Sequence, residues 1–452
     1  MSRAIAPHMV RRARGINPRS FATPLIACET ESSGIFAMIW RLSLSQWLVL
    51  IYPLFLFIVH RRRDEGDVAV VDTSATIQIA LTAVCGLWAL NRAMAALTLF
   101  ERIVISGPLR WLMAYGVLAV LSCSWSDMPT LTLFRGAQLV VYLLLVVDAV
   151  ASLRDVQEML QFQLLYASMA VIFWQLPLLQ NGISIGALHS SDVPGTIIAA
   201  VFMGFMVRGK QWRMLHLALL GALIGATSTG ALFACVGGVI VILLLMRGRA
   251  SGFGVILLCG SLLALLAEPE LVTSVFFFGK QTGQILSGTG RIPIWQWIIE
   301  ERVSQRPILG FGFGQGEVQA RLYNIGGFRM MHMHNAFMSA LVNLGLFGVL
   351  LWALLWSALT RTAWNIRDHK SRLMLVGAAT AVFLNTISME SVTAPLSMPW
   401  IAHAIFFTLL VSGDWTNRSE KWGGKGDVAL YFDLENKGLR PLYRRVGERA
   451  AR

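Results

Sequence analysis

The chain has 452 residues, of which 56% are hydrophobic and only 14% are charged. A soluble protein of this size carries about 25% charged residues, and a helix needs roughly 20 apolar residues to cross a bilayer. The composition therefore excludes an ordinary soluble domain and predicts an all-α polytopic membrane protein with about twelve (11 to 13) transmembrane helices.

The net charge is +13, which first suggests a nucleic-acid partner. We prefer another explanation, because Lys and Arg collect in the cytoplasmic loops of membrane proteins and no soluble basic domain is visible. Nucleic acid is therefore not an expected partner, whereas membrane lipid is. The five cysteines are scattered without metal-ligand spacing, which favours a packing role.

The chain divides into five predicted parts. They are a basic tail at 1–42, a first transmembrane bundle at 43–267, a long loop at 268–334, the last transmembrane helices at 335–412 and a second tail at 413–452. The first thirty residues lack the apolar run of a cleavable signal. The expected spans are 43–59, 76–95, 108–124, 131–150, 158–178, 194–208, 214–227, 230–246, 252–267, 335–359, 372–388 and 398–412.

Short basic loops set the expected orientation. Alternation of the spans places four basic segments on one side, which we take as cytoplasmic. They are the loops containing Arg208–Arg213, Arg247–Arg249 and Arg361–Arg372, and the C-terminal tail. The opposite side then receives Trp125–Thr130, His189–Asp192, Ser287–Asn335 and Met389–Pro395. One basic cluster, His60–Arg63, conflicts with this count. Either the first run does not cross fully, or the other loops outweigh it.

The long outer loop begins with a predicted amphipathic helix. Gly288–Pro293 provides a turn and a helix start, and Trp295, Ile298, Ile299 and Val303 share one face at helical spacing. Arg291 lies at the helix start, where the dipole disfavours a cation unless an anion binds there too. A contact with a lipid headgroup is the alternative.

The glycines that follow, in the segment 307–316, have two interpretations. Spaced glycines can bind phosphate through backbone N–H groups, but this segment lacks the Lys and Ser/Thr of a P-loop. A tight structural turn is favoured.

The loop ends with His332, His334 and Asn335, directly before a long apolar run. Asn335 is a suitable N-cap for the next helix. A metal site is disfavoured, because no acidic residue or cysteine is adjacent. Neutral imidazole is a natural general base near pH 7, so His334 is a candidate base, with a structural interface histidine as the alternative.

The loop thus contains permanent cations and one candidate base, and it has no evident metal or cofactor site. Guanidinium groups form paired hydrogen bonds with phosphate. A site for a phosphate carried on a lipid follows as a hypothesis.

The loop motifs resemble the O-antigen ligase and polymerase superfamily. The matching positions are Gly290-Arg291, Trp295, Pro307, Gly310, Gly312, His334-Asn335, Gly345 and Gly348. Upstream, Trp125-Ser126-Asp127-Met128-Pro129 is similar to a Trp-Ser-x-x-Pro segment of the exopolysaccharide-polymerase branch. The resemblance covers roughly 115–360.

The resemblance implies a GT-C-like, inverting and metal-independent glycosyltransferase of the bacterial inner membrane, with its active site facing the periplasm. The donor would be an oligosaccharide on undecaprenyl pyrophosphate, and the acceptor another glycan. By motif, Arg291 would bind the pyrophosphate and His334 would be the base. The family's second arginine is absent at Thr229, so Arg135, Arg321 and Arg329 are candidates for its role, with Asn335 and His332 as further substrate contacts.

Three functions compete. A polymerase of lipid-linked repeat units is preferred on the Trp125 segment, and a ligase that transfers glycan to lipid A-core or protein is the close variant. A transporter or flippase of the lipid-linked glycan is the alternative from another class, disfavoured because no internal repeat is visible and acidic residues and lysines are nearly absent from span interiors. A non-enzymatic scaffold would not require this loop. Other exopolysaccharide assembly and export proteins are further candidate partners.

Overall fold

The computed structural model describes residues 34–62, 73–95, 101, 103–180, 192–225, 228–246, 248–267, 291–322, 324–325, 328–329, 333–389 and 393–421. The long helices are α2 (Leu44–Arg62), α3 (Thr73–Ala95), α5 (Gly107–Leu121), α6 (Pro129–Ala151), α7 (Val156–Gln180), α8 (Asp192–Gly204), α9 (Lys210–Gly225), α10 (Thr229–Leu245), α11 (Arg249–Ala267), α16 (Ala336–Trp364), α17 (His369–Ser388) and α18 (Met398–Lys421). The short elements are α1 (Ile35–Ile39), α14 (Arg291–Trp297), α15 (Gln315–Arg321), β1 (Asn324–Ile325) and β2 (Phe328–Arg329).

Each apolar interval expected from the sequence coincides with one of the long helices to within about five residues at either end, except that α18 continues beyond the expected end at 412 to Lys421. Four helices of the described chain are long and apolar enough to cross a membrane, namely Ala75–Ala95, Pro129–Ala151, Ala336–Trp364 and His369–Ser388. The class of all-α membrane protein is therefore confirmed. That all of the long helices cross the bilayer stays a prediction.

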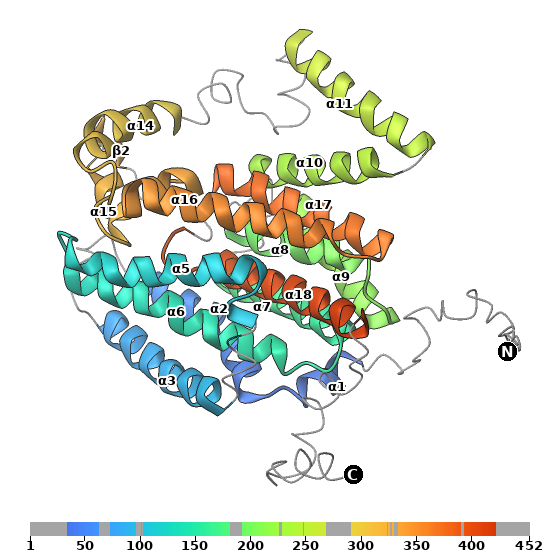
Figure 1. Cartoon of the computed structure of the whole chain (residues 1–452), viewed down its shortest axis with the longest axis horizontal. Coiled ribbons are helices and arrows are strands. Elements are labelled where there is room, and N and C mark those ends of the chain that lie inside the picture. The colour runs from blue at the N-terminus through green and yellow to red at the C-terminus, as the bar shows by residue number, and fades with distance from the viewer. Residues whose placement is uncertain are drawn as a thin grey trace, which may run out of the picture.

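The helices run side by side as a bundle around α18 (Figure 1). This helix contacts α2, α5, α6, α7, α8 and α16, and its residues from Trp400 to Val411 are buried. A second group forms beside it, because α10 packs along α17 and α11 continues from α10 away from the bundle (Figure 1). In a membrane protein the outward-facing side chains of such a bundle contact lipid, so its exposed Leu and Ile residues need no partner within the chain.

One of the loops expected on the cytoplasmic side, between α8 and α9, lies against the start of α7 at one end of the bundle. Gln157 at the start of α7 donates to Met206 O at 3.2 Å and accepts from Arg208 N at 3.0 Å. Arg41 pairs with Glu158 at 3.5 Å near the same place. The α1 segment joins them, because Ile35 N donates to Gln211 Oε1. The basic loop Arg208–Arg213 and Arg41 therefore lie at the same end, which we call the basic end of the bundle.

A buried ion pair holds α2, α3 and α6 together towards this same end. Asp148 on α6 is 3% exposed and lies 3.2 Å from Arg92 Nε on α3. Ser45 on α2 donates to the same carboxylate and accepts from Trp88 Nε1 at 2.8 Å. Asp148 is therefore an acidic residue inside a predicted span, but its partner and burial indicate a structural role.

The α2 helix starts beside this ion pair and continues to Arg62 without a break in the helix. A helix that starts at the basic end and has this length, 19 residues, leaves His60–Arg62 towards the opposite end, whereas Arg63 lies outside the described residues. The structure therefore favours the majority orientation over a first run that stops short, although crossing of a bilayer by α2 stays a prediction.

The predicted outer segment Met389–Pro395 does not lie on the surface as a simple loop. Its described part and the residues that follow enter the bundle, where Thr393 is fully buried. Its carbonyl accepts hydrogen bonds from Tyr115 Oη at 3.0 Å and from Asn343 Nδ2 at 3.3 Å. Tyr52 Oη donates to Leu396 O at 3.3 Å. Irregular backbone at this depth is tolerated because protein groups satisfy its carbonyls.

Candidate functional site

The last turn of α17 brings the two predicted catalytic positions together. Arg291 Nη1, at the start of α14, donates to Ser388 O at 3.0 Å. Asn335 Nδ2, at the start of α16, donates to Ile387 O at 3.1 Å. The final carbonyls of a helix have no partner within the helix, so they readily accept such bonds. The adjacent carbonyls of Ile387 and Ser388 thus place Arg291 next to His334 and Asn335.

Asn335 is the N-cap of α16, as expected from the sequence. Its Oδ1 accepts from Met338 N at 3.0 Å, and its own backbone is extended with φ −159°. Asn335 is 8% exposed, and both polar atoms of its side chain are bonded: Oδ1 to α16 and Nδ2 to α17. Asn335 fixes the angle at which the chain enters α16, and with it the position of His334.

His334 has a left-handed backbone, with φ +50°. Among the described residues it is the only non-glycine residue with a positive φ. A non-glycine residue in such a conformation costs about 1–3 kcal/mol and is typical of functional sites. The preceding residue is held firmly, because Met333 is fully buried and its carbonyl accepts from Trp295 Nε1 at 3.0 Å. The sequence did not reveal this bond, since nothing in a sequence marks which carbonyl an indole will reach.

The helix α14 packs on α16 through a small apolar cluster. Its buried members are Ile294, Ile298, Phe311, Ala320, Met333, Met338 and Val342. The predicted apolar face was partly wrong, because Ile299 is 47% exposed and Ile294 is buried instead. The cause is a π-helical turn at Ile298–Arg302, which adds a residue to the turn and rotates Ile299 outwards.

Arg291 is a partly buried cation. Burial lowers the pKa of its guanidinium, although an arginine stays charged at neutral pH. No carboxylate of the described residues forms an ion pair with it. The start of α10 lies beside the same turn, because a Cβ on Gly230 would come within 2.4 Å of Ser388 Oγ. A cation that is partly removed from water, with no counter-ion among the described residues, is suited to binding an anion.

The glycine segment 307–316 is a structural turn, which confirms the favoured interpretation. Gly310, Gly312 and Gly314 all have positive φ. Three of the glycine N–H groups that could have bound phosphate are used within the protein: Gly310 N donates to Arg306 O, Gly312 N to Asn343 O and Gly316 N to Asn343 Oδ1.

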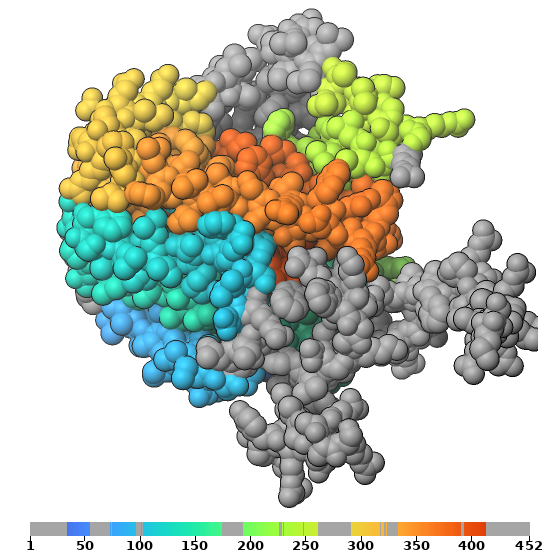
Figure 2. Space-filling view, in the orientation of Figure 1, coloured from blue at the N-terminus to red at the C-terminus, as the bar shows by residue number. Residues whose placement is uncertain are grey.

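The Trp125 segment lies against this turn. Trp125 Nε1 donates to Leu309 O at 3.0 Å, and Phe313 N donates to Ser122 Oγ at 2.9 Å. Arg306 Nη2 pairs with Asp127 Oδ1 at 2.8 Å. Figure 2 shows the surface that results: the gold residues of the loop lie on orange α16 and beside the cyan end of α5 and α6. The two motifs recognised in the sequence, distant along the chain, therefore share one end of the molecule.

The remaining predicted substrate contacts are less closely associated with Arg291. Arg135 on α6 donates to Gln78 Oε1 at 3.4 Å and to Gln138 Oε1 at 3.2 Å, and it lies next to Gly314. Arg321 ends α15 and Arg329 pairs with Asn324 in the β1–β2 hairpin, so the structure places their backbones only. His332 lies outside the described residues. A role for these four in binding stays a prediction.

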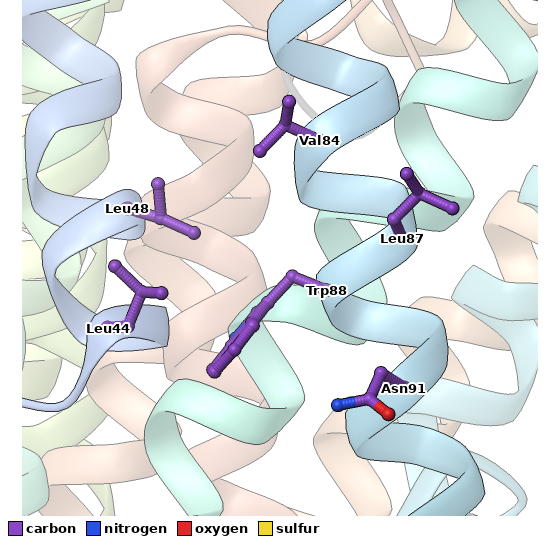
Figure 3. A pocket seen from close by; sticks show the side chains of 6 residues that line it. All are labelled: Leu44, Leu48, Val84, Leu87, Trp88 and Asn91. Atoms are coloured by element: carbon purple, nitrogen blue, oxygen red, sulfur yellow. The ribbon is translucent and has the colours of Figure 1, made fainter.

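A separate apolar groove of about 390 Å³ lies between α2 and α3 (Figure 3). It is lined by Leu44, Leu48, Val84, Leu87, Trp88 and Asn91. Its wall includes no ionisable side chain, and Trp88 belongs to the ion-pair cluster at the basic end of the bundle. The groove therefore lacks the chemistry of the site at α17, and we assign no reaction to it.

Comparison with known proteins gives a match over the segment that contains the candidate site. Residues 214–353 match the family model described as O-Antigen ligase, and this range includes Arg291 and His334. The predicted resemblance to the O-antigen ligase and polymerase superfamily is thereby confirmed for this segment of the chain. None of the curated proteins matches the chain significantly. The Trp125 segment lies outside the matched range.

Proposed function

We propose that this O-antigen ligase-type membrane enzyme is a polymerase of lipid-linked glycan repeat units. The donor would be an oligosaccharide on undecaprenyl pyrophosphate, and the acceptor a second glycan, at the periplasmic face of a bacterial inner membrane in a GT-C-like fold. The observation that carries the proposal is the anchoring of Arg291 and Asn335 to adjacent carbonyls of α17. This arrangement supports a cation and a candidate base acting on one substrate.

Arg291 would bind the pyrophosphate of the donor. Its guanidinium is half buried and has a protein carbonyl, rather than a carboxylate, as its described partner. Charge-assisted hydrogen bonds to a phosphate oxygen are shorter and stronger than neutral ones. As the glycosidic carbon is attacked, negative charge grows on the departing pyrophosphate, and a fixed cation stabilises it.

His334 would accept the proton of the attacking hydroxyl group. The acceptor oxygen forms a bond to the anomeric carbon of the donor, the bond to pyrophosphate breaks on the opposite face, and the configuration inverts. The imidazole takes the hydroxyl proton, and undecaprenyl pyrophosphate leaves. The strained backbone of His334 and the tight anchoring of Met333 support a ring held in one place for this step.

We further propose that the reaction needs no metal ion, since Arg291 would supply the positive charge. Activity is expected to survive EDTA. A complete loss that a divalent cation restores would contradict this part of the proposal.

A ligase is the second candidate, because the matching family is described as O-Antigen ligase. The preference for a polymerase rests on the Trp125 segment, which contacts the loop through Leu309 and Arg306. The chemistry at Arg291 and His334 would be the same in both.

Replacing Arg291 provides the direct test. Arg291→Ala should abolish polymer while the protein remains in the membrane, and Arg291→Lys should retain only part of the activity, because Lys lacks the planar fork. Arg110→Ala is the matched control, since Arg110 is an exposed arginine on α5 that stacks on Trp111. Normal polymer from Arg291→Ala would remove Arg291 from the site.

A further inference from the structure

The Trp125 segment and the turn that follows α14 border an open, shallow pocket of about 320 Å³. It is lined by Trp125, Arg306, Pro307, Ile308, Leu309 and Gly310. Small-molecule sites commonly have volumes of about 300–1,000 Å³, so the pocket can hold one small unit rather than a long ligand. None of these lining residues has a part in the transfer step described above.

The pocket is rigid because its turn is bonded to α16. Phe311 N donates to Val342 O at 2.9 Å, and Leu346 N donates to Pro307 O at 2.9 Å. Gly345 interrupts the helix with φ +63° and lets the carbonyl of Ile308 approach closely. The wall of the pocket therefore exists before any ligand arrives, which reduces the entropy cost of binding.

The rim of the pocket carries a charged pair that contributes little to stability. Arg306 and Asp127 lie 2.8 Å apart, and their side chains are 38% and 49% exposed. Exposed pairs stabilise proteins only weakly. Arg306 is nonetheless held in one geometry, because it also donates to Trp125 O at 3.2 Å and lies over the ring of Phe311. The pocket therefore brings together an oriented guanidinium, its partner carboxylate and the Trp125 indole that lines it.

This combination matches the chemistry of a sugar ring. The C–H face of a pyranose packs on an aromatic ring, and its hydroxyl groups both donate and accept hydrogen bonds. A carboxylate accepts and a guanidinium donates, so a rim with both can bind neighbouring hydroxyls. We propose that this pocket is a glycan-binding subsite that holds one sugar residue of the growing chain.

The position of the pocket fits a subsite rather than the reacting centre. Ile308 contacts Gly345 on α16, and His334 precedes the start of the same helix. At about 1.5 Å per residue, the helix separates the two by roughly 15 Å. A glycan that reaches His334 with its acceptor end would therefore place a residue a few sugars away in the pocket. This inference rests on the proposed function, since it takes the substrate to be a glycan.

Two conservative variants test the subsite. Asp127→Asn removes the charge but keeps the shape, and Arg306→Lys keeps the charge but loses the planar fork. Glu158→Gln and Arg41→Lys make the same changes in the matched ion pair at the opposite end of the bundle. The measurement is the length distribution of polymer made in cells, together with the amount of lipid-linked single units.

We expect about tenfold weaker retention of the glycan in the pocket variants, because a hydrogen bond to a charged group is lost. Their polymer should be shorter, while single units are still consumed and the control variants make normal lengths. Wild-type polymer lengths from both pocket variants would overturn the subsite alone. The same result is expected if the pocket binds a lipid headgroup instead of a glycan. If the wild-type chain consumes single units without making any polymer, the proposed function fails, and the subsite fails with it.

Discussion

At the scale of single residues, two substitutions of His334 test separately whether its side chain is catalytic and whether its backbone is strained. His334→Ala keeps a side chain with Cβ at φ +50°, whereas His334→Gly relieves that strain. A left-handed backbone costs a non-glycine residue roughly 1–2 kcal/mol. We expect His334→Gly to be about 1 kcal/mol more stable than His334→Ala, with both inactive. Thermal unfolding in detergent and polymer analysis are the measurements.

An active glycine variant would contradict the role of His334 as base. Equal stability of the two variants would instead show that the strain is absent in the membrane-embedded protein. Polymer analysis and thermal unfolding are independent measurements, so the same two variants test both the role of the side chain and the strain of the backbone.

The residue contacts also show where sequence reasoning was sufficient. Asn335 was identified as an N-cap because a short polar side chain before an apolar run has few other uses there. Arg291 was singled out as a cation at a helix start. Their shared anchor on α17 was not foreseen, because the carbonyls of Ser388 and Ile387 are backbone groups that every residue type provides. The π-helical turn that exposes Ile299 likewise has no signal in apolar spacing.

At the scale of elements, Gly345 joins the loop to the bundle. Its φ is +63° and ψ −153°, and a Cβ there would lie 2.2 Å from the carbonyl oxygen of Ile308. Gly345→Ala should therefore destabilise the protein by roughly 3 kcal/mol and disturb the turn at Gly310. Gly221→Ala in α9 is the control, because a Cβ meets nothing within 4 Å there. Thermal unfolding of the two variants, with polymer analysis, checks this.

The control should be neutral or stabilising by up to about 1 kcal/mol, since alanine is the better helix former. Equal stability of the two glycine variants would mean that the turn does not contact α16 as described.

The Asp148–Arg92 pair is the second element-scale test, and it bears on the transporter alternative. Removing one partner of a buried pair costs roughly 3–5 kcal/mol, and we expect the lower end because Arg92 is 34% exposed. Asp148→Asn should therefore lower the thermal stability and leave the activity per folded molecule unchanged. A stable variant with no activity would instead favour a proton or ion relay and a transporter.

At the scale of the whole molecule, the apolar runs placed the long helices well because loops and spans differ so strongly in composition. The sequence also placed Trp125–Thr130 and the long loop on the same side, and contacts between Trp125, Leu309 and Arg306 now join them. The entry of Thr393 into the bundle was missed. Alternation of spans predicts only on which side a loop lies, and not how far it returns towards the core.

The arrangement as a whole supports one site at one end of the bundle. Arg291, the His334–Asn335 step and the last turn of α17 meet there, and the Trp125 pocket is joined to them by the first turns of α16. The basic loop Arg208–Arg213 and Arg41 lie at the other end. A donor carried in the membrane could thus reach the site from the bilayer while the glycan extends away from it.

The lipid-linked glycans of a deletion strain test this account most directly. The strain would carry either the wild-type chain or His334→Ala, and lipid extracts would be analysed for the length of glycan on the carrier. We predict that single repeat units accumulate at the periplasmic face with His334→Ala and are consumed with the wild type. Long glycans that stay on the carrier without reaching an acceptor would indicate a ligase instead. Single units confined to the cytoplasmic leaflet would indicate a flippase and would contradict the roles assigned to Arg291 and His334.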